Sequence, residues 1–580
     1  MFRFGFLALS AIALAACATN TPLNAPTLSP ALSDQDELSK EIDVVSTFAI
    51  AKYAGLTKEP ELSAEHYIRL LEDVQTDPWI AEQAIFSVLR LGDMSTAIQL
   101  ARSLPIETLN QTELPRLTLA VAALKEGDDL VTLTHLRSRW QSSFHSMLAR
   151  SLAAWAALDA DPDTAIALQA ESGRGEGVYA IISQTMAALM KASLGREAEA
   201  LEDLNILWVV QARLALGVET QARLLALQGE TETALSHLAT FRKEVGRHPA
   251  LLALADEIQS GDVAEFMTLS EQQGAARMLY LAIAPQAMEA YGDVATVYFT
   301  LANYLDPEFY AIQSFWANTL DQAGRRPEAI AMLQSIPETS VHHTSAQGQL
   351  AWALRREGRD AEALTIARDT LLRTNNRNIR IQLADLLQTL DRDGEAEKTF
   401  TEIIAEDEAE GEYDWRIYFA RGAARERLGF WPLAESDLKT ALTLNPEDAT
   451  LMNYLGYSWI DRGINLEAGL EMIENALMLE PRSGPITDSL GWAHYRLGNY
   501  ELAIIYLEHA TELSPDIAEI LDHLGDAYWQ VGRFKEAGFQ WQRALKYSDD
   551  QTEIETLKDK LERGLTLQSA KTTSTPTRFP

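Results

Sequence analysis

The chain has 580 residues, too many for one compact core, so several structural units are expected. Apolar residues make up 47% of the chain, which excludes a disordered protein. Lysine and arginine number 49 against 84 aspartates and glutamates, a formal charge of −35. A chain this acidic repels nucleic-acid phosphates and anionic lipid surfaces, so we expect neutral or cationic partners and no nucleic acid.

The first 16 residues are predicted to be a secretory signal peptide. Arg3 is followed by an apolar run from Phe4 to Ala16, which is too short to remain as a membrane-spanning helix. The run ends in Leu14-Ala15-Ala16-Cys17, which resembles the lipobox of bacterial lipoproteins, and Cys17 is the only cysteine. The alternative is a generic signal followed by an unmodified Cys17.

The lipobox resemblance implies that the chain is cut before Cys17 and that this residue carries lipid. A lipoprotein has three acyl chains, and each buried CH₂ contributes about 0.8 kcal/mol to membrane binding. Ala18 stands where family members retained at the inner membrane have aspartate, so the resemblance implies the outer membrane, facing the periplasm. Membrane contact is therefore expected through this N-terminal lipid.

Residues 17–38 are predicted to be the lipidated cysteine and a flexible tether. Three prolines, Pro22, Pro26 and Pro30, alternate there with Thr, Ser and Asn. About 20 such residues span roughly 25 Å as a coil and at most about 65 Å when extended. The folded body is therefore expected to stay close to its membrane.

Helical periodicity dominates from about residue 40 to residue 565, and strand patterns are nearly absent, so an all-α fold is predicted. A small residue after a Gly-containing turn recurs every 33 to 38 residues, at Ala295, Ala329, Ala363, Ala396, Ala434, Ala468, Ala503 and Ala537. A mid-helix glycine recurs with it, at Gly422, Gly456, Gly491 and Gly525. A proline does the same, at Pro446, Pro481 and Pro515. Because a mid-helix glycine costs about 1 kcal/mol, its recurrence predicts a closely approaching second helix.

Two stretches carry a recognisable repeat motif. Leu521-x-x-Leu524-Gly525-x-x-Tyr528, with Gly532, Ala537, Trp541 and Ala544, resembles a tetratricopeptide repeat, as does Leu490-Gly491 with Ala503, Ala510 and Pro515. Leu521 and Thr487 stand where the family often has tryptophan. Four units, from about 415 to 548, match well, and the resemblance implies an α-α superhelical solenoid.

Glycine turns followed by a small residue continue, less regularly, towards the N-terminus. At a repeat length of roughly 34 residues they predict about 15 helical hairpins. The phase slips near residue 270, so divergent repeats are predicted over 39–270 and tetratricopeptide repeats over 271–550, followed by a terminal helix and disordered tail over 551–580. An acidic insertion, Glu406 to Asp414, is predicted to be a long loop between repeats.

Catalytic and metal-binding interpretations have little support. Asp488, Ser489 and His494 suggest a triad, but Ser489 and His494 are five residues apart on one helix and do not share a face. The histidines lack H-E-x-x-H spacing, and the acidic insertion lacks the pattern of a calcium loop. No metal, no cofactor and no enzymatic activity are therefore expected.

A protein-binding groove is expected on the first helices of the C-terminal hairpins, which line the concave side in this repeat class. The residues predicted to face it are Arg416, Phe419, Arg427, Asn453, Tyr457, Asp461, Asp488, Trp492, Tyr495, Arg496, Asp522, Asp526 and Trp529. Their aromatics and interleaved charges would anchor a peptide or helix. The alternative is that Tyr457, Trp492 and Trp529 pack between repeats, and alanine at Trp492 and Trp529 distinguishes the two by the melting temperature.

The layout of lipobox, tether and about 15 hairpins is similar to that of Gram-negative outer-membrane lipoproteins with tetratricopeptide repeats, among them adaptor lipoproteins of periplasmic carboxyl-terminal-processing proteases. This resemblance implies a scaffold that holds a protease and delivers substrates such as cell-wall hydrolases. Two alternatives stay open. One is an assembly factor for a pilus, secretin, polysaccharide exporter or barrel-insertion complex, and the other is an enzyme within the N-terminal half.

Overall fold

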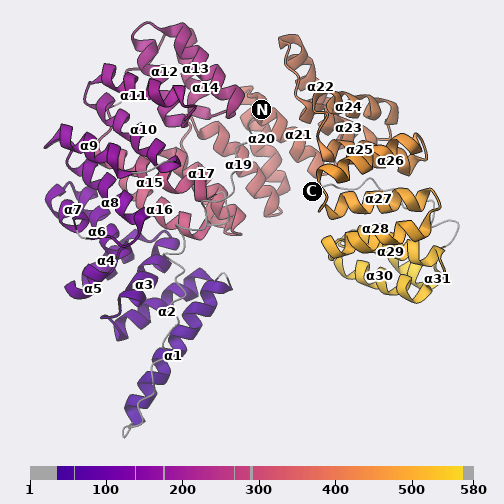
Figure 1. The fold of residues 1–580 in the computed structure, drawn as a ribbon, viewed down its shortest axis with the longest axis horizontal. Helices are drawn as coiled ribbons and strands as arrows, with labels where there is room; N and C mark the ends of the chain where they lie inside the picture. The colour runs from indigo at the N-terminus through magenta and orange to yellow at the C-terminus, as the bar shows by residue number, and fades with distance from the viewer. Residues whose placement is uncertain are drawn as a thin grey trace. The chain divides into compact units, whose positions relative to one another are not determined.

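A computed structural model of the chain describes residues 35–57, 59–137, 139–173, 177–266, 268–287 and 292–565. Within these residues it contains 31 α-helices and no strand (Figure 1), which confirms the all-α prediction. No helix in the described ranges is both long and apolar enough to cross a bilayer. The predicted signal peptide, Cys17, most of the tether and the tail beyond residue 565 lie outside the described residues.

Contacts between helices divide the chain into two compact units, residues 1–359 and 360–580. The helices of the N-terminal unit are α1 (Gln35–Leu56), α2 (Pro60–Asp73), α3 (Pro78–Arg90), α4 (Met94–Ser103), α5 (Ile106–Gln111), α6 (Leu114–Glu126), α7 (Asp129–Leu136), α8 (Ser143–Ala156), α9 (Pro162–Ser172), α10 (Val178–Ser193), α11 (Glu197–Val209), α12 (Ala215–Leu227), α13 (Thr231–Glu244), α14 (Pro249–Ser260), α15 (Glu271–Ala287), α16 (Gly292–Leu305), α17 (Tyr310–Gln322), α18 (Arg326–Ser335) and α19 (His343–Arg356). Because α1 begins at Gln35, the last residues of the predicted tether are helical.

The boundary between compact units does not lie near residue 270, where the phase of the repeats slips. Helices α15 and α16 pack back against α3, α6, α8 and α10, and Figure 1 shows them beside α8 and α10. The hydroxyl of Thr300 donates to the carbonyl of Leu89 at 2.9 Å, and Arg90 forms an ion pair with Asp293 at 3.1 Å. These contacts across about 200 residues hold the helices that follow residue 270 in the N-terminal unit.

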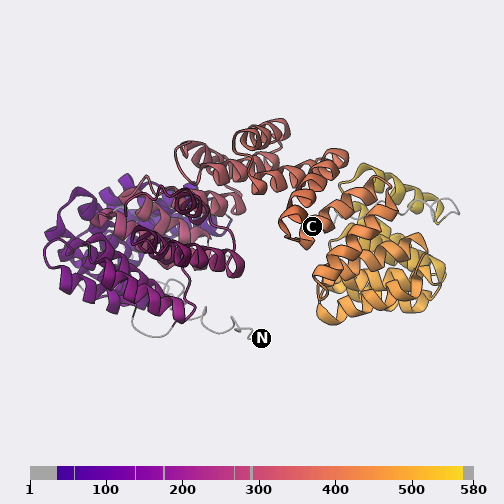
Figure 2. The ribbon, with the colours of Figure 1, turned by 90° about the horizontal axis from the view of Figure 1, so that it is seen from above.

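The C-terminal unit continues the repeat through successive hairpins, which are labelled in Figure 1 and seen from above in Figure 2. Its helices are α20 (Asp360–Thr374), α21 (Arg377–Thr389), α22 (Asp393–Glu410), α23 (Trp415–Arg427), α24 (Trp431–Leu444), α25 (Ala449–Arg462), α26 (Leu466–Leu479), α27 (Gly484–Arg496), α28 (Tyr500–Leu513), α29 (Ala518–Gln530), α30 (Phe534–Tyr547) and α31 (Gln551–Arg563). The prediction of a long acidic loop is wrong, since residues 406–410 extend α22 and only Gly411 to Asp414 link it to α23.

The mid-helix glycines stand where the two helices of a hairpin approach most closely, as predicted. A Cβ at Gly491 would lie 2.7 Å from Leu507 Cγ, and one at Gly525 would lie 2.4 Å from Trp541 Nε1. Ala503 and Ala537, on the facing helices, are fully buried. In the α25–α26 hairpin Gly469 takes this place, and Ala468 is exposed, because one extra residue shifts the register there.

Candidate functional site

The candidate site lies on the side of the C-terminal unit formed by α21, α23, α25, α27 and α29, the first helices of its hairpins, and is called here the first-helix face. The glycine turns at Gly429, Gly463, Gly498 and Gly532 all have a positive φ and reverse the chain after each first helix but α21. Along this face α25 contacts α27, and α27 contacts α29. Equivalent positions of α25, α27 and α29 therefore lie side by side.

A ladder of polar pairs joins each first helix from α23 to α29 to the preceding hairpin. Each rung connects residues 34 to 36 positions apart in the sequence, which is one repeat length. The rungs are Asp393–Arg427 at 2.7 Å, Glu426–Arg462 at 3.1 Å, Asp461–Arg496 at 2.7 Å, and Tyr495–Gln530 at 3.1 Å. Arg427, Asp461, Tyr495 and Arg496, all predicted to face a partner, are thus engaged within the chain.

The predicted groove residues divide by exposure. Asn453, Asp488, Trp492, Asp522 and Asp526 are buried. Phe419, Arg427, Tyr457, Asp461, Tyr495 and Trp529 are half-buried, and Arg416 and Arg496 are exposed. The structure therefore leaves the half-buried aromatic edges and the two exposed arginines accessible on this face. Four of the buried members contact the following repeat or the terminal helix, namely Asp488, Trp492, Asp522 and Asp526.

Trp492 is a packing residue at the contact between α27 and α29. Its side chain is only 2% exposed and lies between two rings, stacked on Tyr495 at 4.5 Å and on His523 at 4.0 Å. The prediction that Trp492 faces a partner is therefore wrong, because the next repeat supplies a ring that covers it.

His523 carries a positive charge inside this stack. Its Nδ1 donates to both carboxylate oxygens of Asp488, at 3.0 Å and 3.1 Å. Burial alone would lower the pKa of His523, but the charge of Asp488 and this hydrogen bond raise it to about 9. An imidazolium against the face of Trp492 adds a cation–π attraction. Asp488 is thus paired with His523 and not with His494, and the Ser489 hydroxyl donates to the Pro485 carbonyl at 3.1 Å.

The terminal helix α31 covers α29, which is the first helix of the last hairpin. Lys560 of α31 is 0% exposed and donates to Asp522 at 2.7 Å and to Asp526 at 2.8 Å. Burial raises the pKa of Asp526 to about 6 although Lys560 opposes this, and Asp526 also accepts a hydrogen bond from Trp541 Nε1 at 3.0 Å. The two aspartates predicted to face a partner therefore bind the chain's own C-terminal helix.

Trp529 is held by the same terminal segment. A Cβ at Gly564 would lie 2.0 Å from Trp529 Cζ2, and the ring also packs on Phe534 at 4.5 Å. His523 and Lys560 were not among the predicted site residues, yet they contact four of them: His523 contacts Asp488 and Trp492, and Lys560 contacts Asp522 and Asp526. Both follow a buried aspartate by one repeat length, His523 by 35 residues from Asp488 and Lys560 by 34 from Asp526. Complementary charges at that spacing were the signal that could have found them.

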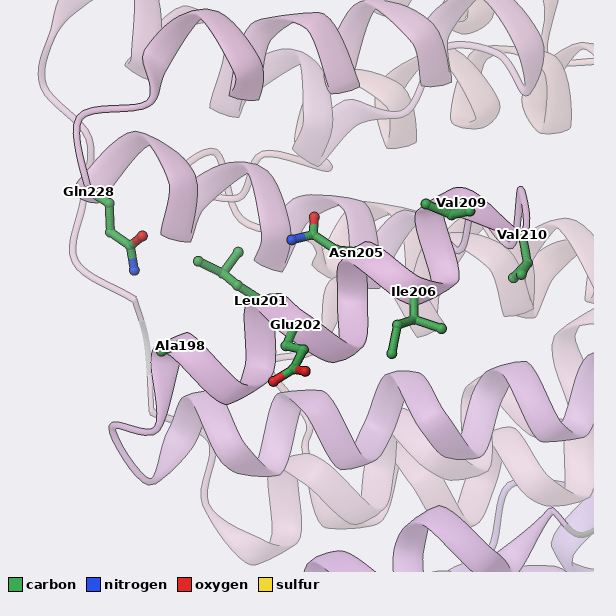
Figure 3. A pocket seen from close by; sticks show the side chains of 8 residues that line it. All are labelled: Ala198, Leu201, Glu202, Asn205, Ile206, Val209, Val210 and Gln228. Atoms are coloured by element: carbon green, nitrogen blue, oxygen red, sulfur yellow. The ribbon is translucent and has the colours of Figure 1, made fainter.

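A hollow of about 630 Å³ lies on the N-terminal unit along α11 and the end of α12 (Figure 3). Its lining is largely apolar and consists of Ala198, Leu201, Glu202, Asn205, Ile206, Val209, Val210 and Gln228. Within the described residues no three His, Cys, Asp or Glu side chains are placed to hold a metal ion.

Comparison with known proteins agrees with the repeat seen in the C-terminal unit. Residues 489–551 match the tetratricopeptide repeat family. A TPR repeat-containing protein of Pseudomonas aeruginosa is 32% identical over 85 residues, which are 15% of this chain and 14% of that protein. Residues 489–551, which contain α28 to α30 and part of α27, are thus similar in sequence to tetratricopeptide repeats.

Similar solved structures include a chain of the APC/C hetero-tetramer Cut9–Hcn1, at 15% identity and a TM-score of 0.39, and yeast Tom70, at 14% and 0.35; each match covers 90% of this chain and 96% of the other. A tetratricopeptide repeat protein from Parabacteroides merdae has 17% identity and a TM-score of 0.38, over 44% of this chain and 97% of its own. At these scores the likeness extends no partner or activity to this chain.

Proposed function

We propose that this protein is a non-enzymatic scaffold that binds protein partners on the first-helix face of its C-terminal unit. The observation that carries the proposal is the stack of tetratricopeptide hairpins fixed by the polar ladder. Stacked hairpins of this type present an extended surface, and a surface that is already rigid loses little entropy on binding. The partners expected are peptides or helices that contact several repeats at once.

The accessible part of this face centres on α23 and α25. Arg416 is exposed, with its guanidinium 5.0 Å from the ring of Trp415, and the half-buried rings of Phe419 and Tyr457 come from the same two helices. Phe419 packs edge-on against Tyr454 at 5.1 Å, so its position is fixed before a partner arrives. Aromatic and arginine side chains held in this way are the residue types that dominate binding energy in protein interfaces.

We propose further that the chain is anchored by lipid on Cys17 to the outer membrane, on its periplasmic side. What supports this is the sequence at the N-terminus, where the lipobox-like segment precedes Ala18. Cys17→Ser should move the protein from the membrane fraction to the soluble fraction of osmotically released cells. A Cys17→Ser protein that stays with the membrane fraction would contradict the anchor.

The partner we propose is an envelope protease of the carboxyl-terminal-processing type, together with its cell-wall hydrolase substrates; the support is the overall layout of the sequence. The experiment is affinity capture from detergent-solubilised envelopes with the wild-type chain and the double variant Arg416→Glu/Tyr457→Ala. Leu433→Glu, a substitution at an exposed leucine of α24, is the matched control.

We expect the wild type and the control to retain a serine protease that the double variant loses, with all three melting at similar temperatures. Loss of capture together with a large loss of stability would contradict a binding role for these residues. A secretin or export component in place of the protease would favour the assembly-factor alternative.

A further inference from the structure

The first helix, α1, has an apolar face that no described part of the chain covers. Its inner side packs on α2, where the Ser63 hydroxyl donates to the Ala51 carbonyl at 3.0 Å and Arg69 pairs with Asp43 at 2.7 Å. Thr47, Ala51 and Ala54 are buried on that side. The helix lies at the end of the N-terminal unit in Figure 1.

The outer side of α1 is as apolar as the inner side. The side chains of Ile42, Val45, Tyr53 and Leu56 are 60%, 55%, 66% and 75% exposed, and Ala49 lies exposed between them. At about 100° per residue these five positions fall within one stripe of roughly 80°, opposite the buried residues. The terminal helix of a repeat stack normally turns a polar face to water. An apolar stripe there indicates a missing helical partner.

The spacing of the stripe identifies that partner. Relative to Ala49 the four large residues stand at −7, −4, +4 and +7, so the pattern is the same when read in either direction. An isologous interface requires this property, because residue i then contacts residue j and j contacts i. We propose that α1 pairs in antiparallel fashion with α1 of a second copy of this chain, with the two Ala49 residues at the crossing point.

In this pairing Ile42 meets Leu56 of the second copy, Val45 meets Tyr53, and Ala49 meets Ala49. A small residue at the centre lets the two helices approach closely, since the distance between helix axes depends on the side chains at the contact. No charged residue lies in the stripe. Lys52, at its edge, is level with Ser46 of the second copy, so like charges do not meet directly.

A parallel pairing fits less well. A parallel coiled coil repeats its seam in alternating steps of three and four, which would place Lys52 in the seam in place of Tyr53. The hollow along α11 shows no comparable internal symmetry, and nothing in its lining identifies an occupant. The stripe on α1 is thus the surface for which the residue spacing itself indicates an occupant, a second copy of α1.

Cysteine cross-linking tests both the contact and its direction in the full chain carrying Cys17→Ser, which has no other cysteine. Ala49→Cys should form a disulfide-linked dimer in oxidising buffer, because the two residues face each other. Ile42→Cys and Leu56→Cys should each fail alone, since identical residues are about 21 Å apart along the axis, but a mixture of the two should cross-link. Leu130→Cys, exposed on α7, is the control.

Sedimentation velocity of the full Cys17→Ser chain in detergent then measures the association without a cross-link. Ala49→Glu places two carboxylates against each other at the crossing point and should weaken the dimer at least tenfold, whereas Leu130→Glu should leave it unchanged. The proposal is overturned if Ala49→Cys cross-links no better than Leu130→Cys, if Ile42→Cys alone cross-links as well as the mixture, or if Ala49→Glu sediments like the wild type.

Discussion

Raising the pH should weaken the contact between α27 and α29 through the loss of one proton. His523 is buried, it donates to Asp488, and its pKa is raised from 6.5 to about 9. A group whose pKa is higher in the folded state stabilises that state below its unfolded pKa, and the contribution disappears as the pH rises through the folded value. The stabilisation is therefore complete below pH 6.5 and lost by about pH 10.

The magnitude follows from the size of the change in pKa. At about 1.4 kcal/mol per pH unit, a rise from 6.5 to about 9 corresponds to about 3 kcal/mol of unfolding free energy. That is a large fraction of the 5–15 kcal/mol by which domains are typically stable. The contact should thus be one of the most pH-sensitive parts of the C-terminal unit between pH 6.5 and 9.

The comparison that isolates this proton is between the wild type and His523→Gln, unfolded with urea at intervals from pH 6 to pH 10. Glutamine cannot carry the charge, so the variant should be less stable than the wild type at pH 6 and the difference should shrink as the pH rises. The loss of ring stacking on Trp492 adds a constant offset, which is why the change in the difference, and not its size, is the readout. A difference that stays constant over this range would refute the assignment of the proton to His523.

Three further outcomes are expected. Lys560→Met leaves Asp522 and Asp526 buried without a cation, so it should lower the free energy of unfolding by about 3–5 kcal/mol and speed amide exchange in α31. Adding Asp522→Asn and Asp526→Asn should recover most of that loss. Equal stability of the single and triple variants would contradict the ion-pair account. Gly525→Ala places a Cβ 2.4 Å from Trp541 and should lower the free energy of unfolding by about 1–3 kcal/mol. Gly538→Ala, within α30 and with open space around it, should raise it by about 0.5–1 kcal/mol. Melting temperatures that shift in the same direction for both variants would count against close helix contact at Gly525. Trp492→Ala should cost about 3–5 kcal/mol, seen as a clear drop in melting temperature, and an unchanged melt would restore Trp492 as a binding residue.

The helices and their pairing could be predicted because the signals for them are local and periodic. Gly491 and Ala503 lie twelve residues apart, within one hairpin, and the need for a small residue at each is visible in every repeat. Where the register shifts by one residue, at Ala468 and Gly469, a strict count of alanines fails although the packing rule holds. The fold of a hairpin is therefore encoded within about 34 residues.

The exposure of the candidate site could not be predicted in the same way, because it depends on the following repeat. Position alone places Asp488 and Trp492 on the first-helix face, but the imidazole of His523, 35 residues later, covers both. The packing of α15 and α16 against α3 and α6 is further from any local signal, since it joins residues about 200 positions apart. No repeat spacing specifies a contact of that kind.

The ladder also decides which charges on the first-helix face a partner can use. Arg496 is exposed but paired with Asp461, whose side chain is only 10% exposed. A partner carboxylate that captures Arg496 would leave Asp461 half-enclosed without its cation, and removing one member of such a pair costs more than an open surface pair contributes. A cationic or neutral group that approaches Asp461 leaves the rung intact and adds attraction. The ladder therefore favours the same neutral or cationic partners that the overall charge of −35 favours, and it does so at the one face where binding is proposed.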